Sequence, residues 1–272
     1  MPAFLFPARK AVTNSMTVDS SSFREIIIES SLDGSLEPSL LFLPERPAAL
    51  VVGLHTWSAD RFNQMKMLPF CQERGWALLL PEFRGPNTIH NPRAREAGGS
   101  RLARRDIVDA TKWVTEQFLG SDTPTFLLGG SGGGHMALLV AAREPFSWRA
   151  VSSWCPITDL APWHGDNPRY TQHIEAVCGG PPGVSEEVDE EYRSRSPITF
   201  AESLRSVRLH LAHGRHDISV PYRHSWDLAG KLIDEPLFYL SIFDGKHEMR
   251  MPSAFEFFDQ TLDGESSAQL TG

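Results

Sequence analysis

The pattern of apolar and polar positions changes character near residue 45. Before that point, residues 23–29 and 40–43 form short β-rich runs separated by Asp33-Gly34, which is typical of an antiparallel hairpin. After it the apolar runs are continuous, beginning with residues 48–54, as expected of strands that are covered on both faces. Segments with helical spacing alternate with these runs. The pattern therefore predicts a mostly parallel, twisted sheet with helices on both faces.

Eight strands and five helices follow from this pattern. After the hairpin, strands are predicted at residues 48–54, 76–80, 125–128, 150–154, 207–211 and 237–243. Helices are predicted at residues 63–74, 102–118, 137–142, 225–233 and 254–262. Residues 155–206, after the sixth strand, form a long irregular segment, and such segments usually carry function or cover a site. The acidic run at residues 185–191 within it is interpreted as a solvated helix face.

The composition bounds the class of protein. A chain of 272 residues with 41% hydrophobic content can bury a large core, and we expect one domain over residues 23–263, with residues 155–206 as its cap or substrate-binding segment. Residues 1–22 are predicted to be a flexible extension and residues 264–272 a flexible tail.

Charge and cysteine content narrow the partners and the compartment. The net charge of −8 argues against a general attraction to nucleic acid or anionic membranes, so small molecules are the expected partners. No apolar run is long enough for a membrane span, and no secretory signal is recognisable, so we expect a cytoplasmic protein. Cys71, Cys155 and Cys178 fit a reducing compartment better than a disulfide framework, with a bridge between Cys155 and Cys178 left open.

The stretch around Ser131 carries the strongest chemical signal. Gly129-x-Ser131-x-Gly133 follows an apolar strand and precedes an apolar helix, which is the pattern of a nucleophile elbow. In such a turn the serine takes an unfavourable backbone conformation, and side chains two residues to either side would collide. A glycine-rich connection without any chemistry is the plain alternative.

A second fingerprint overlaps this stretch. Gly132-x-Gly134-x-x-Ala137 satisfies the dinucleotide-binding pattern G-x-G-x-x-A. That pattern is normally followed about 20 residues later by an acid that binds the ribose, and residues 147–151 contain none. We therefore favour the nucleophile and expect no cofactor.

A serine hydroxyl becomes a good nucleophile only when a histidine takes its proton and an acid orients that histidine. In this kind of fold the three follow in the order serine, acid, histidine. His247 stands between the last strand and the last helix, and Asp217 lies just past the strand at residues 207–211. Asp244 is the alternative acid, but it shares one short turn with His247. Ser131, Asp217 and His247 are the predicted catalytic residues.

Three further histidines suggest a metal site by residue type. His210 lies within a predicted strand, whereas His213 and His216 lie in the following loop, so we do not expect them to converge on one ion. No metal is predicted. His213 is instead expected to support the loop that presents Asp217.

The oxyanion of a tetrahedral intermediate needs two backbone N–H donors. Gly132, which follows the nucleophile, is expected to supply one, and Trp57 the other, with Thr56 as the alternative. The Trp57 side chain either packs in the interior or forms a wall of the acyl pocket. The candidate substrate-binding residues are Trp57, Phe83, Arg84 and Trp163.

Short motifs spread over residues 40–262 extend these signals. They are Leu54-His55-Thr56-Trp57, Phe83-Arg84-Gly85, Asp106-Ile107-x-Asp109-Ala110, Gly129-Gly130-Ser131-Gly132-Gly133, Pro156-Ile157-Thr158-Asp159-Leu160, Tyr192-Arg193-x-Arg195-Ser196-Pro197, His213-Gly214-x-x-Asp217-x-x-Val220-Pro221 and Gly245-x-His247-Glu248. Together they resemble an α/β-hydrolase, and specifically the catalytic domain of the prolyl oligopeptidase family. The resemblance implies the α/β-hydrolase fold and a serine hydrolase.

Two differences from that family guide the expected substrate. The family's peptidases usually carry an N-terminal propeller, which residues 1–22 and one hairpin do not supply, and Thr56-Trp57 stands where relatives carry two glycines. We therefore expect a carboxylesterase that cleaves a small ester through an acyl-enzyme. The alternative is an aminopeptidase or acylaminoacyl-peptidase that acts on a short peptide. A non-enzymatic binding protein on the same fold is a third possibility.

Overall fold

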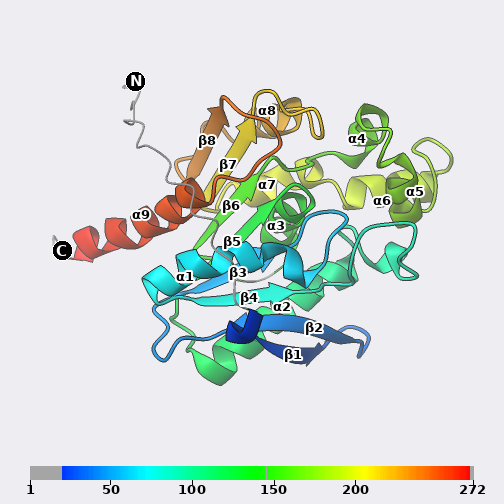
Figure 1. Cartoon of the computed structure of the whole chain (residues 1–272). Coiled ribbons are helices and arrows are strands. Elements are labelled where there is room, and N and C mark those ends of the chain that lie inside the picture. Colours follow the sequence, from blue (N-terminus) through cyan, green and yellow to red (C-terminus); the bar gives the residue numbers. More distant parts are fainter. Residues whose placement is uncertain (1–19, 145, 147, 270–272) are drawn as a thin grey trace.

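One mixed sheet forms the centre of the protein (Figure 1). The computed structural model describes residues 20–144, 146 and 148–269. In chain order the strands are β1 (Arg24–Glu29), β2 (Leu36–Phe42), β3 (Leu50–Leu54), β4 (Ala77–Pro81), β5 (Thr125–Gly130), β6 (Ala150–Trp154), β7 (Leu209–Gly214) and β8 (Phe238–Phe243). In space their order is β1-β2-β4-β3-β5-β6-β7-β8. The pairs β1–β2 and β2–β4 are antiparallel and all others are parallel, so the predicted mostly parallel sheet is confirmed.

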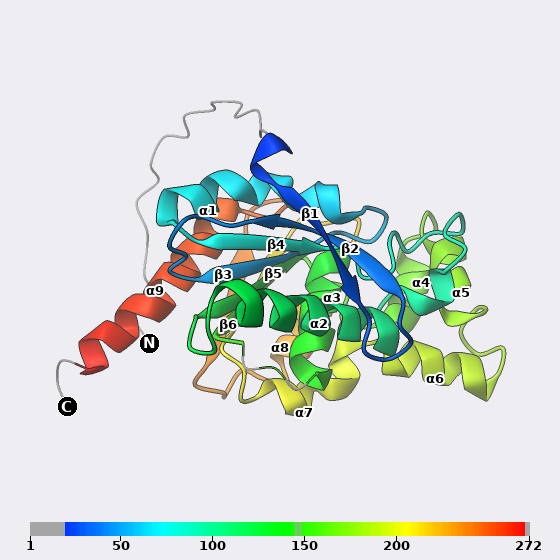
Figure 2. The same cartoon turned by 90° about the horizontal axis from the view of Figure 1, so that it is seen from below.

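Helices cover both faces of this sheet (Figure 2). They are α1 (Leu68–Arg74), α2 (Arg101–Phe118), α3 (Gly132–Arg143), α4 (Leu160–Asp166), α5 (Thr171–Cys178), α6 (Glu186–Ser194), α7 (Ala201–Leu204), α8 (Arg223–Ala229) and α9 (Met251–Gln269). Helices α1 and α9 lie on one face, and α2, α3 and α8 lie on the other.

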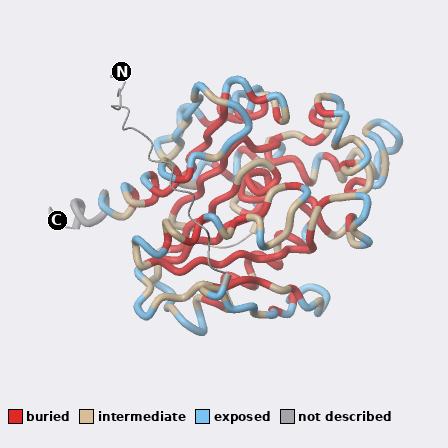
Figure 3. Tube along the Cα trace, in the orientation of Figure 1, coloured by how far each residue is buried: buried red, intermediate tan, exposed pale blue. Residues whose placement is uncertain are grey.

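Neighbouring residues of the central strands belong to two different cores. Val51 and Leu128 pack with apolar residues of α1 and α9, whereas Val52 and Leu127 pack with those of α2 and α3. Because successive side chains of a strand point to opposite faces, a strand covered on both sides must be apolar throughout. This explains the continuous apolar runs of the sequence, and Figure 3 shows these strands buried along their length.

The segment from residue 155 to 206 differs from the irregular stretch that was predicted. It contains α4, α5, α6 and α7, and the first three lie together at one end of the sheet (Figure 1). A third apolar cluster holds this segment together. Trp57, from the loop after β3, also packs into this cluster. The members of this cluster from the segment are Ile157, Leu160, Trp163, Ile174, Val177, Cys178 and Tyr192. The acidic run lies on α6, where Glu186, Glu187 and Glu190 are exposed as predicted.

Several boundaries also differ from the prediction. The predicted helix at residues 63–74 is a 3₁₀-helix (Arg61–Met67) followed by α1, with Pro69 in the first turn of α1. Helix α9 begins earlier than expected and continues to Gln269, into the segment predicted as a tail. The predicted N-terminal extension falls mostly on residues 1–19, which lie outside the described residues, as do residues 270–272.

The described residues contain neither a disulfide bond nor a helix that could span a membrane. Cys71, Cys155 and Cys178 are all free, so the possible bridge between Cys155 and Cys178 is not formed. Among the helices of the described ranges, none combines the length and the apolar character needed to cross a membrane.

Candidate active site

Ser131 occupies a strained turn between β5 and α3. Its backbone angles are φ 57° and ψ −122°, a left-handed conformation that is costly for a residue with a side chain. A Cβ added at Gly129 would lie 2.2 Å from the carbonyl oxygen of Gly133, so this turn requires glycine at that position. The Ser131 amide donates to the carbonyl of Trp154 at 2.8 Å, and the His135 amide donates to the carbonyl of Ser131 at 2.9 Å. These contacts hold the strained geometry of the predicted elbow.

Asp217 and His247 lie side by side, although 30 positions separate them in the chain. His247 Nδ1 is 2.6 Å from Asp217 Oδ2. The Asp217 side chain is completely buried, whereas that of His247 is 30% exposed. An imidazole whose Nδ1–H donates to a carboxylate presents Nε2 as an acceptor. His247 is therefore set up to receive a proton at Nε2.

Three further donors hold the Asp217 carboxylate in place. The amides of Ser219 and Val220 donate to Oδ1 at 2.8 and 2.9 Å, and His213 Nε2 lies 3.2 Å from Oδ2. Burial alone would raise the pKa of Asp217, but the hydrogen bonds from His213, His247 and Val220 outweigh it and hold the pKa well below its usual range. The carboxylate thus stays ionised beside His247.

The alternative acid, Asp244, and the three histidines that suggested a metal site have other neighbours in the structure. Asp244 lies 2.9 Å from His216 Nε2 and is largely exposed, so its nearest histidine is not His247. His210 lies 3.1 Å from Ser152 Oγ, and the His213 ring bridges Ser225 and Val220. These histidines have different neighbours, and His213 contacts the loop that carries Asp217 (residues 215–222, the acid loop), as predicted.

The two predicted oxyanion amides lie close together. Gly132 is the first residue of α3, where a backbone N–H has no partner within the helix. A Cβ added at Gly132 would lie 2.3 Å from the Trp57 nitrogen, which shows how closely the two backbones approach. The alternative donor, the amide of Thr56, instead donates to Asn63 Oδ1 at 3.2 Å. The Trp57 amide is thus the better placed of the two.

A small pocket contains Ser131 and His247. Its volume is about 150 Å³, and Ser131 and His247 line it together with Cys155 from the end of β6. The 3₁₀-helix before α1 contributes Asn63, Gln64 and Lys66, and Thr56, Gly130, Trp154, Glu248 and Met249 complete the lining. We did not predict the contribution of the 3₁₀-helix. The available signal was its polar residues, which come directly after the loop that carries Thr56 and Trp57 (residues 55–60, the oxyanion loop).

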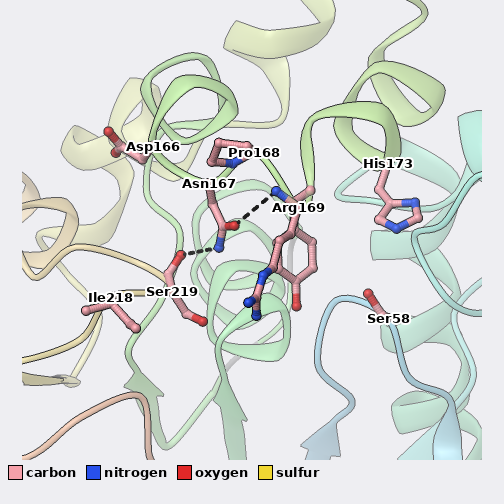
Figure 4. Close-up of a pocket in the computed structure, with 9 residues that line it drawn as sticks. Ser58, Asp166, Asn167, Pro168, Arg169, His173, Ile218 and Ser219 are labelled. Atoms are coloured by element: carbon pink, nitrogen blue, oxygen red, sulfur yellow. Dashed lines mark hydrogen bonds between the residues drawn. The ribbon is translucent and has the colours of Figure 1, made fainter.

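A larger cavity of about 600 Å³ lies between the oxyanion loop and the acid loop (Figure 4). Ser58 follows Trp57, and Ile218 and Ser219 follow Asp217. The remaining lining residues come from the segment after β6 and are Asp166, Asn167, Pro168, Arg169, Tyr170 and His173. The Asn167 amide group donates to the carbonyl of Ser219 at 2.8 Å and so joins the two sides.

The predicted substrate-binding residues have other positions. Phe83 stacks on His55 with ring centroids 3.8 Å apart, and Arg84 is fully buried among carboxylates. Neither lines the two cavities, because both side chains turn into the interior. This corrects their predicted role.

The two tryptophans lie beneath the larger cavity rather than in it. Trp57 and Trp163 are each 1% exposed and pack edge to face at 5.0 Å. Trp163 Nε1 donates to the carbonyl of Ser219 at 3.0 Å. They support residues that line the cavity, and neither side chain forms its wall.

Within the part of the chain that the structure describes, one set of side chains has the atom types of a metal site. Ligand atoms of Cys155, Asp217 and His247 lie within 4.8 Å of one another. Burial raises the pKa of Cys155 to about 12, so its thiol stays protonated and is a weak ligand. The hydrogen bond between Asp217 and His247 occupies the other two groups, so this arrangement favours acid–base chemistry.

Comparisons with known proteins identify relatives of this chain and of its fold. The dipeptidyl aminopeptidase BIII of Pseudoxanthomonas mexicana is 22% identical over 242 residues, which cover 84% of this chain and 34% of that protein. An acylaminoacyl peptidase of Pyrococcus horikoshii superposes with a TM-score of 0.70 at 18% identity, over 88% of this chain and 41% of its own. A puromycin-hydrolyzing peptidase of Mycobacterium tuberculosis gives the same TM-score and identity over 85% and 37%.

These likenesses confirm the predicted α/β-hydrolase fold, and the chain spans about a third of the length of the curated relative. The sequence pattern of the prolyl oligopeptidase family matches residues 64–259, from the 3₁₀-helix before α1 to the last helix. That range contains the elbow, the acid loop and the histidine loop. The chain therefore belongs to the prolyl oligopeptidase family.

Proposed function

We propose that this protein is a serine hydrolase in which Ser131 is the nucleophile, His247 the general base and Asp217 the residue that orients His247. The observation that carries the proposal is the 2.6 Å contact between His247 Nδ1 and Asp217 Oδ2, beside a pocket that His247 shares with the strained Ser131. Ser131 Oγ attacks the substrate carbonyl while its proton passes to His247 Nε2. The Gly132 and Trp57 amides stabilise the oxyanion.

The two cavities then take different parts of the substrate. His247 must protonate the leaving group as it departs, so the leaving group lies in the small pocket that His247 lines. The acyl part extends from the oxyanion loop into the larger cavity, whose volume of about 600 Å³ suits an aminoacyl group with a blocking group on its nitrogen. Water activated by the same histidine releases the acyl group.

We place the substrate on the peptidase side of the family. The relatives named above are an aminopeptidase and acylaminoacyl or puromycin-hydrolyzing peptidases, which favours this alternative over the carboxylesterase that was our first expectation. Asp166 is the carboxylate among the residues that line the larger cavity, and it is paired with Arg223. A free ammonium group would lack a partner there, so we favour a blocked amino terminus.

A panel of substrates tests this choice. We expect N-acetyl-aminoacyl p-nitroanilides to be cleaved with kcat/KM values that match or exceed those of short p-nitrophenyl esters. Free aminoacyl anilides should be at least about tenfold poorer than their acetylated forms, since an unpaired cation would be left in the cavity. Esters that exceed the anilides by about 10²-fold would restore the carboxylesterase interpretation.

Covalent labelling tests the nucleophile separately. A fluorophosphonate probe should label the wild-type protein at Ser131, and Ser131→Ala should abolish labelling and lower kcat by at least about 10³-fold. The circular dichroism of the variant should be unchanged. Labelling at another serine would remove Ser131 from its proposed role.

A further inference from the structure

Arg169 brings an uncompensated positive charge to the larger cavity. Its backbone amide donates to Asn167 Oδ1 at 3.3 Å, which fixes the turn between α4 and α5. Figure 4 shows its side chain extending between Ser219 and Ser58. Across the described ranges, no carboxylate lies within ion-pair distance of its guanidinium group. The charge is therefore available to a ligand.

The carboxylate nearest in the cavity lining does not compensate this charge. Asp166 is ion-paired with Arg223 on α8, and His224 Nε2 lies 3.4 Å from its other oxygen. In Figure 4 its carboxylate points away from Arg169. The cavity thus keeps one positive charge, although the whole chain has a net charge of −8.

Three other polar side chains of the lining can act as donors. Ser58 and Tyr170 contribute hydroxyl groups. His173 Nδ1 accepts a hydrogen bond from the Ile89 amide at 3.1 Å, so a neutral His173 carries its hydrogen on Nε2. Burial and the nearby His90 lower the pKa of His173, which favours this neutral form. A ligand rich in acceptor atoms would suit such a surface.

We infer that the acyl part of the substrate carries a carboxylate, which Arg169 binds in the larger cavity. The inference rests on the proposed function, because that function places the acyl group there. A guanidinium group can bind a carboxylate through two parallel N–H donors, and such pairs are among the stronger hydrogen bonds. The carboxylate can belong to an acidic side chain next to the scissile bond or to a dicarboxylic blocking group on the nitrogen.

Pairs of substrates that differ only in charge test the inference. The first pair is N-acetyl-Glu and N-acetyl-Gln p-nitroanilide, and the second is N-succinyl-Ala and N-acetyl-Ala p-nitroanilide. For the wild-type protein we expect the anionic member of at least one pair to have a kcat/KM about tenfold higher, mainly through KM. The pair that discriminates identifies the position of the carboxylate. Equal rates within both pairs would overturn the inference.

Variants distinguish a specific effect of Arg169 from the general effect of removing a positive charge from the protein. Arg169→Met should bring the ratio of kcat/KM within the discriminating pair close to one, mainly because KM for the anionic member rises. Arg169→Lys should keep part of the preference, because it retains charge but loses the paired donors. Arg205→Met is the matched control, since Arg205 is exposed on the surface and does not line the cavity, and it should retain the full preference. A preference that survives in Arg169→Met would also overturn the inference.

The design distinguishes this inference from the proposed function. If amide cleavage fails, the same acyl groups can be supplied as p-nitrophenyl esters, which test the preference for a carboxylate independently of the leaving group. Fluorophosphonate labelling reports whether Ser131 is active in every variant. An active protein without a charge preference refutes only the role of Arg169.

Discussion

The side chains of the candidate site depend on unusual backbone positions. Ser131 and Cys155 both have positive φ values, 57° and 44°, and both follow directly on buried strands. Each such position costs about 1–3 kcal/mol unless its surroundings compensate. The Cys155 amide donates to the carbonyl of Ala212 at 2.7 Å, and Ser131 is held by Trp154 and His135. The neighbouring strand β7 thereby helps to maintain the geometry around Ser131.

Replacement of the two candidate acids tests which one orients His247. Asp217→Asn should lower kcat by about 10³- to 10⁴-fold, because an amide favours the wrong tautomer of the histidine. Asp244→Asn should change kcat by less than about threefold, since Asp244 lies beside His216 on the surface. Steady-state kinetics with one acylated anilide measure both. The opposite ranking would assign the orienting role to Asp244.

The lowered pKa of Asp217 also predicts how stability depends on pH. Because this carboxyl group is more acidic in the folded protein than its usual value of about 3.9, its ionisation stabilises the fold above that pH. The contribution decreases progressively as the pH falls from about 4 towards the lowered pKa of Asp217. Urea unfolding at pH 7, 5 and 3.5 should therefore show that the difference in stability between wild type and Asp217→Asn narrows towards acid. A constant difference would contradict the lowered pKa.

At the scale of elements, Arg84 joins three parts of the chain. Its guanidinium group contacts Asp33 in the β1–β2 turn at 2.8 Å, Glu96 at 2.9 Å and Asp106 on α2 at 2.5 Å. The Arg84 side chain has no exposed surface. The hairpin, the loop after β4 and helix α2 are thus fixed to one another by a buried charge, which explains why its motif occurs outside the substrate site.

Removal of this charge should weaken the fold without removing the nucleophile. Arg84→Met leaves Asp106 buried without its partner, and the loss of one member of a buried ion pair typically costs about 3–5 kcal/mol. Urea unfolding measures this loss, with Arg193→Met as the control on an exposed ion pair that should change stability by less than about 1 kcal/mol. The folded variant should still react with the fluorophosphonate. If Arg84→Met instead lost labelling but kept its stability, Arg84 would have a role in the substrate site.

The sequence predicted best those elements whose signal is local, that is, elements recognisable from their own residues without knowledge of distant contacts. Strands β3 and β4 are apolar at every position because both faces are covered, and the elbow has a local steric requirement for glycine. Helix α4 was missed because seven residues with Pro162 and Gly165 carry little helical signal of their own. Its stability comes from packing on Trp57, a residue far away in the sequence. The role of Arg84 was mistaken for the same reason, since its partners come from distant segments.

At the scale of the whole molecule, the two sides of the site come from different parts of the chain. The small pocket is lined by the 3₁₀-helix before α1 and by the His247 loop, whereas the larger cavity is built mainly from the segment after β6. The acid loop lies between them, because Asp217 contacts His247 and the next two residues line the larger cavity. Changes in the segment after β6 can thus alter the larger cavity while the contact between Asp217 and His247 is preserved.

This division predicts how the protein distinguishes two isomeric substrates. N-acetyl-Phe-Ala-amide places its large side chain on the acyl side, in a cavity of about 600 Å³, whereas N-acetyl-Ala-Phe-amide must place it in the pocket of about 150 Å³. Burial of a phenylalanine side chain contributes about 1.5–3 kcal/mol, so the first isomer should be cleaved at its internal peptide bond at least about tenfold faster. Product formation can be followed by chromatography, with N-acetyl-Ala-Ala-amide as the reference that lacks a large group. If the second isomer is cleaved faster, the leaving group occupies the larger cavity, and Arg169 would then face the departing amine rather than the acyl group.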